Sequence, residues 1–293
     1  AVSLLKSAKR PVIIAGHGAR FHRDRIQAFA EAYKIPVLTT FKGKGIISDH
    51  HPLGCGVLGR SGTPIASWFM NESDCLLVLG ASLSTQTGIE KKKTPIHVDN
   101  DPKLLGKVHP LEVLMWGEIG VTLDILKKEL SGQMTNVDQT GEVAERWQIW
   151  RTEKEKREGE DLGNGVNAAS IFAAMNRTVA RDAVIAVDVG NNTYSFGRYF
   201  ECTEQSVIMS GYLGSIGFGF PAAMGAWAAE GDKRQILAVT GDGGFGQYMG
   251  EMTTAVKYGM NLTHVLLNNH SIAKIAKEQL AGHFDVWQTD LHN

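Results

Sequence analysis

The sequence predicts an α/β protein with two Rossmann-like domains, each built on a doubly wound parallel sheet. Short apolar runs alternate along the chain with helix-like stretches, a pattern typical of mostly parallel sheets. Glycine-rich turns follow several of these runs, at the place where open α/β sheets bind ligands. The length of 293 residues also fits two domains of ordinary size.

Residues 1–132 are expected to form the first domain. The chain opens on a helix-like segment, and a helix near 120–130 closes the domain. A glycine turn and a helix through Tyr33 follow the first strand. The predicted strands cover residues 11–15, 36–40, 75–80 and 95–99.

Residues 133–164 are polar and are interpreted as a linker with a surface helix. That charged helix is predicted over 142–160. Trp147 and Trp150 are three positions apart and therefore share one helix face. We expect this face to dock the helix rather than to bind a ligand.

Residues 165–293 are expected to form the second domain. Its strands are predicted over 183–188, 236–239 and 265–267, with a small-residue helix over 222–230. The residues that follow Asn269 are too few to complete a doubly wound sheet. We therefore expect this domain to be incomplete at its C-terminus.

The motif that points to chemistry pairs Asp242 with Asn269, 27 positions later. Asp242 lies in a glycine turn after one apolar run, and Asn269 follows the next run. A helix from about 246 to 258 is predicted to join the two strands, which places both side chains at one sheet edge. Carboxylate and amide oxygens suit Mg²⁺, which usually also takes phosphate oxygens and water. Glycines let backbone N–H groups approach a phosphate.

This glycine–aspartate turn with its asparagine pair resembles the thiamin diphosphate motif of the 2-oxo-acid decarboxylase superfamily, of the pyruvate oxidase and acetolactate synthase type. The resemblance covers nearly the whole chain, as a middle domain followed by most of a diphosphate-binding domain. It implies that Asp242, Asn269 and the backbone carbonyl of Ser271 bind Mg²⁺. It also implies that thiamin diphosphate is the cofactor. The cofactor-binding residues of this motif are Gly241, Asp242, Gly243, Gly244 and Asn269.

Two further segments carry the resemblance. The stretch 211–219 resembles the family segment in which a bulky apolar residue forces the cofactor to bend. This implies that Ile216 is that wedge and that Gly214 and Ser215 also contact the cofactor. The alternative is a core isoleucine between closely packed glycines. The turn after strand 183–188 matches a diphosphate-contacting loop, which implies binding by Gly190, Asn191 and Asn192; a plain strand-ending turn is the alternative.

The first domain resembles the family's middle domain, which carries FAD in the flavin-containing members. The turn 16–18 and the stretch 97–102 match its glycine turn and its acidic strand end. The turn lacks a third glycine, however, and residues 80–85 contain no arginine where many flavin-containing members have one. The sequence therefore leaves FAD binding open.

The resemblance implies decarboxylation of pyruvate or a related 2-oxo acid, followed by oxidation or carboligation. In the family an activating glutamate comes from an N-terminal pyrimidine-binding domain, which no segment here matches. We therefore expect the chain to be inactive by itself, to need that domain and to form a homodimer or homotetramer. The alternative is a non-catalytic regulatory or cofactor-binding module that keeps only metal–diphosphate binding.

Composition narrows the class of protein. The chain is 43% hydrophobic and 21% charged, with a net charge of −1. These values fit a globular protein with no bulk attraction to nucleic acid or to membranes. Its three cysteines have no metal-ligand spacing, and no signal peptide is visible. We expect a reduced, cytoplasmic protein that acts on a small 2-oxo acid.

Overall fold

The computed structural model describes residues 1–292, which form two compact units. Unit 1 contains residues 1–173 and 197–203; unit 2 contains 174–196 and the described residues from 204 onward. Each unit is built on a parallel sheet with helices packed against it, which confirms the predicted fold class. In the described residues no helix is long and apolar enough to cross a membrane.

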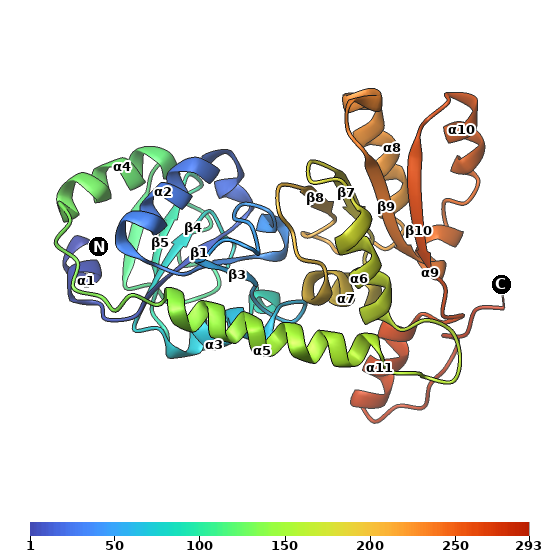
Figure 1. Ribbon diagram of the computed structural model, residues 1–293, viewed down its shortest axis with the longest axis horizontal. Coiled ribbons are helices and arrows are strands. Elements are labelled where there is room, and N and C mark those ends of the chain that lie inside the picture. Colours follow the sequence, from blue (N-terminus) through green and yellow to red (C-terminus); the bar gives the residue numbers. More distant parts are fainter. Residues whose placement is uncertain (293) are drawn as a thin grey trace. The chain divides into compact units, whose positions relative to one another are not determined.

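Unit 1 has a six-stranded parallel sheet in the order β3-β2-β1-β4-β5-β6, the order of a Rossmann fold. Helices α2 and α4 cover one face and α3 and α5 cover the other (Figure 1). The strands are β1 (Pro11–Ala15), β2 (Val37–Thr39), β3 (Gly54–Val57), β4 (Cys75–Leu79), β5 (Ile96–Asp99) and β6 (Val113–Trp116). The helices are α1 (Val2–Ser7), α2 (Arg23–Tyr33), α3 (Pro64–Glu72), α4 (Ile119–Leu130) and α5 (Thr140–Glu158).

Helix α5 is part of the core of unit 1. Trp147 and Trp150 are 3% and 6% exposed and pack with Val143 against the sheet. The Trp147 Nε1–H donates to the Gly54 carbonyl at 2.7 Å. The shared tryptophan face therefore docks the helix, as predicted. The units differ from the predicted bounds of 1–132, 133–164 and 165–293, because this apolar face binds the supposed linker helix to unit 1.

Unit 2 has a four-stranded parallel sheet in the order β10-β9-β7-β8. Helix α8 packs its small residues and Phe220 on one face of this sheet. The strands are β7 (Val184–Val187), β8 (Ser206–Met209), β9 (Ile236–Gly241) and β10 (Leu262–Leu267). The remaining helices are α6 (Ala168–Thr178), α7 (Asn191–Tyr199), α8 (Gly219–Glu230), α9 (Asp242–Gly246), α10 (Glu251–Lys257) and α11 (Ala273–Ala281).

The helix predicted over 246–258 is wrong in its bounds. The chain instead forms the short helix α9, which begins at Asp242 itself, and then α10, which begins at Glu251. Gly246 and Gly250 flank the break between them. Glycine is a poor helix former, so the helix is interrupted between these two residues. The consequence is that Asp242 lies in the first turn of a helix.

Candidate functional site

Three parallel strands of unit 2 end at one edge of the sheet, and the predicted site residues follow them. Val187 of β7 pairs with Val239 of β9, and Gly241 of β9 pairs with Leu267 of β10. Strand β8, which follows β7 in the sequence, lies on one side of β7, and the next strand, β9, lies on the other side, so the switch point of the fold lies between β7 and β9. Open α/β sheets bind ligands at this point.

Asp242 follows β9 directly and is buried, with 5% of its surface exposed. Its Oδ1 accepts a hydrogen bond from the Gly243 N–H at 3.0 Å. Its Oδ2 is buried and has no hydrogen-bond partner among residues 1–292. Burying a carboxylate oxygen without a partner is costly, and a bound cation offsets that cost. The side chain therefore fits the predicted role of Mg²⁺ ligand.

Asp188 is a second buried carboxylate at this edge, and the sequence-based site did not include it. Its Oδ1 accepts hydrogen bonds from the N–H groups of Val189 at 2.6 Å and Gly217 at 2.8 Å. Burial raises the pKa of Asp188, and these backbone N–H groups oppose the rise. A Cβ at Gly244 would lie 2.4 Å from Asp188 Oδ2, so a side chain there would displace the Asp188 carboxylate. Asp188 thus joins the turns after β7 and β9 to the glycine-rich loop.

The turn after β7 is held by its own polar side chains. The Asn192 amide donates to the carbonyls of Asp188 at 2.8 Å and Val239 at 3.4 Å. The Thr193 hydroxyl donates to the Asp188 carbonyl at 2.6 Å and accepts from the Gly190 N–H at 3.2 Å. The Asn192 amide is therefore already engaged in joining β7 to β9. Asn191 is half-buried at the start of α7.

The loop 211–218 presents Ile216 at the surface. Gly214 and Ser215 are exposed, and Ile216 is 36% exposed. The Ser215 N–H donates to Ser210 Oγ at 3.1 Å. An isoleucine this exposed is not a core residue, so the core alternative for Ile216 does not describe its environment.

The chain after β10 folds back beside the Asp242 turn. Asn269 is exposed, and Ser271 forms an antiparallel bridge with Asp290. A Cβ at Gly243 would lie 3.4 Å from Ile272 Cγ1 and 3.2 Å from Leu291 Cδ1. This contact brings the segment that contains Asn269 and Ser271 to the turn that contains Asp242.

The donor set suits a hard cation and a phosphate together. The described residues contain no group of three or more His, Cys, Asp or Glu side chains that could hold a metal ion by themselves. One carboxylate with an amide and a carbonyl oxygen would leave positions for phosphate oxygens and water. That is the usual way in which proteins bind Mg²⁺.

The glycine turn of unit 1 packs closely against the residues that follow β4. The Gly16 N–H donates to the Leu79 carbonyl at 2.8 Å, and the Gly18 N–H donates to the Gly80 carbonyl at 2.9 Å. A Cβ at Gly16 would lie 2.3 Å from the Gly80 oxygen. These glycines allow two backbones to pack closely, and neither N–H is left for a pyrophosphate.

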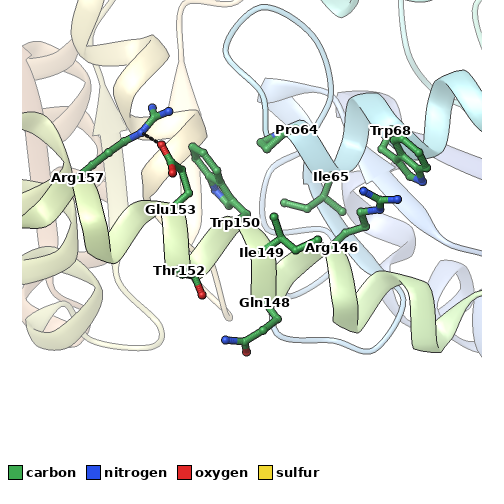
Figure 2. Close-up of a pocket in the computed structure, with 10 residues that line it drawn as sticks. All are labelled: Pro64, Ile65, Trp68, Arg146, Gln148, Ile149, Trp150, Thr152, Glu153 and Arg157. Carbon is green, nitrogen blue, oxygen red and sulfur yellow. Dashed lines mark hydrogen bonds and ion pairs between the residues drawn. The ribbon is translucent and has the colours of Figure 1, made fainter.

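A groove of about 700 Å³ on unit 1 lies between α3 and α5 (Figure 2). Its walls are largely apolar, and Arg146 stacks on the Trp68 ring with 3.6 Å between the guanidinium carbon and the ring centroid. Arg157 is paired with Glu153 at 2.8 Å. None of the predicted site residues lines this groove.

Comparison with known proteins gives two family matches. The thiamine pyrophosphate enzyme central domain matches residues 1–126. The thiamine pyrophosphate enzyme C-terminal TPP binding domain matches residues 188–291, which contain every predicted site residue. The two matches agree with the order of the two units along the chain.

Similar proteins extend well beyond this chain. YdaP of Bacillus subtilis, which is named as a putative thiamine pyrophosphate-containing protein, is 33% identical over 99% of this chain and 50% of its own length. The acetolactate synthase large subunit of Parasynechococcus marenigrum is 31% identical over 92% of this chain and 44% of its own length. That of Lactococcus lactis is 30% identical, over 94% and 48%. The chain spans about half the length of these relatives.

Proposed function

Because the chain belongs to the thiamine pyrophosphate enzyme family, we propose that its unit 2 binds the diphosphate of thiamin diphosphate through Mg²⁺. The whole protein would then act on pyruvate or a related 2-oxo acid. When bound, the cofactor supplies a nucleophilic carbon and an electron sink for decarboxylation. The relatives named acetolactate synthase support carboligation as the following step; oxidation of the pyruvate oxidase type is the second outcome that we propose to test.

The buried Asp242 Oδ2 without a partner carries this proposal. In the proposed site this oxygen, the Asn269 side-chain oxygen and the Ser271 carbonyl hold Mg²⁺. Gly241, Gly243 and Gly244 keep the turn free of side chains, so that a diphosphate can approach the first turn of α9. Asp188 fixes the loop that carries Ile216, and Ile216 then supports the bent cofactor.

Further parts of the proposal concern partners. We propose that the family's pyrimidine-binding domain completes the active site and that the protein is a homo-oligomer. The proposal does not include FAD. The N–H groups of Gly16 and Gly18 already donate to backbone carbonyls and are therefore not free to bind the pyrophosphate of FAD. An absorbance spectrum of the purified protein decides this point, and a bound flavin would require a different binding segment in unit 1.

Calorimetry tests the metal–diphosphate site. Asp242→Asn removes a charge that faces both the cation and the turn. It should weaken Mg²⁺-dependent binding of thiamin diphosphate at least tenfold, which is about 1.4 kcal/mol. Asp182→Asn is the matched control, because Asp182 is exposed and precedes β7 at the other edge of the same sheet. Equal affinities for both variants and the unchanged protein would contradict the proposal.

A further inference from the structure

His264 contacts the Asp242 turn from the neighbouring strand. The residue lies in the middle of β10, half-buried, and pairs with Ala238 of β9. Its Nε2 is 2.7 Å from Oγ1 of Thr240, which is fully buried. Its ring lies against the ring of Phe245, with 4.4 Å between the centroids and an angle of 56°.

The two residues that His264 contacts lie on either side of Asp242 in the sequence. Thr240 lies two residues before Asp242, and Phe245 lies three residues after it. One side chain therefore touches the turn on both of its sides. Phe220 of α8 completes the cluster, with centroids 5.3 Å from His264 and 5.4 Å from Phe245.

The residues around Thr240 fix the direction in which its hydroxyl points toward His264. A Cβ at Gly219 would lie 2.9 Å from Thr240 Cγ2 and 2.9 Å from Asp188 Cβ. The methyl group of Thr240 is thus packed tightly at the start of α8, while its hydroxyl reaches His264. The rotamer of Thr240 is fixed by contacts on both sides, and so is the end of β9.

We propose that His264 is a positioning residue, which holds the Asp242 turn through Thr240 and Phe245 in the geometry that binds Mg²⁺ and diphosphate. This inference rests on the proposed function of unit 2. Groups that orient a metal ligand without touching the metal commonly affect metal affinity about 10- to 100-fold.

The imidazole acts in its neutral form. Burial lowers the pKa of His264, and no charged neighbour contributes to that shift. The side chains packed on it, Thr240, Phe220 and Phe245, do not titrate near neutral pH. The hydrogen bond with Thr240 is therefore one between two neutral groups.

Two pairs of variants separate the contacts. His264→Phe keeps an aromatic ring but loses the hydrogen bond to Thr240. Thr240→Val keeps the shape of the side chain without its hydroxyl, whereas Thr240→Ser keeps the hydroxyl. Leu262→Ala is the control for general loss of stability, since Leu262 packs on the same cluster from the same strand and pairs with Ile236, at the end of β9 that is farther from the turn.

The measurement is calorimetry of thiamin diphosphate with Mg²⁺ on the full chain, with the melting temperature recorded beside it. His264→Phe and Thr240→Val should each weaken binding about tenfold. Their double variant should be no weaker than either alone, and Thr240→Ser, which keeps the hydroxyl but loses the packed methyl group, should bind more tightly than Thr240→Val. Leu262→Ala should melt at a lower temperature with unchanged affinity.

The outcomes distinguish two failures. If the unchanged protein binds with Mg²⁺ and both His264→Phe and Thr240→Val bind equally well, this inference is overturned and the proposed function stands. If the unchanged protein does not bind, both are overturned. A loss of affinity in Leu262→Ala equal to that in His264→Phe would also overturn the positioning role, because any loss of stability would then suffice.

Discussion

Individual polar side chains in unit 2 divide into those that have an oxygen without a hydrogen-bond partner and those that hold the backbone. Asp242 offers a buried oxygen without a partner, whereas the Asn192 amide is bonded to two carbonyls. The site predicted from the sequence did not include Asp188 or His264, although Asp188 lies at the end of a predicted strand. Their importance comes from contacts with residues far away in the chain, which no local pattern contains.

Ile216 allows a prediction that separates catalysis from stability. Because Ile216 is 36% exposed, Ile216→Ala leaves little cavity, and the loss of stability should be below about 2 kcal/mol, the lower end for core truncations. Turnover of the whole enzyme should nevertheless fall, while cofactor affinity changes less. A melting curve, a binding titration and a turnover assay check this. A lower melting temperature with normal turnover per folded molecule would refute the wedge role.

His97 predicts how stability depends on pH. Burial lowers its pKa below the ordinary 6.5, although the Asp99 carboxylate lies 3.8 Å away and opposes the shift. Below pH 6.5 the unfolded chain then binds more protons than the folded chain. The contribution of His97 to the free energy of unfolding is therefore complete above pH 6.5, its pKa in the unfolded chain. That contribution is lost as the pH falls through the lower pKa that His97 has in the folded chain.

Urea unfolding at a series of pH values measures this effect. The free energy of unfolding should fall with pH on the acid side of 6.5, and His97→Gln should reduce that slope. Identical slopes for the variant and the unchanged protein would show that another group is responsible.

At the scale of elements, α5 shows how one helix face decides where a segment belongs. Most charged side chains of this helix are partly exposed, whereas Val143, Trp147 and Trp150 are buried against the sheet of unit 1. The sequence predicted the shared tryptophan face correctly. It could not identify the docking surface, since β3 contains two glycines and did not resemble a strand.

Trp147 should therefore contribute strongly to the stability of unit 1. Trp147→Ala removes a nearly fully buried ring and its hydrogen bond to the Gly54 carbonyl, at a cost of about 3–5 kcal/mol. Ile149 is on the same helix and is 54% exposed, so Ile149→Ala should cost no more than about 0.5 kcal/mol. Chemical unfolding of both variants checks the difference. Similar losses would mean that α5 is held by something other than this face.

At the scale of the whole molecule, the apolar runs predicted β1, β2, β4, β5, β7, β9 and β10 close to their actual positions. Strands β6 and β8 were missed, and both are only partly buried. The spacing of the glycine–aspartate turn and the asparagine pair predicted two adjacent parallel strands, and β9 and β10 are such a pair. The fold-back of residues 289–291 onto 270–272 was missed, because the bridge joins segments without strand character.

We propose above all that Asp242, Asn269 and the Ser271 carbonyl bind one divalent cation at the edge of unit 2. The most direct test is a crystal structure of the protein with thiamin diphosphate and Mn²⁺ in place of Mg²⁺, with the anomalous signal of manganese recorded. We predict one anomalous peak between Asp242 Oδ2 and the cofactor diphosphate, with all three protein oxygens about 2.0–2.3 Å from it, as expected for a small hard cation. A fully bound cofactor whose manganese lies away from Asp242 would contradict the account.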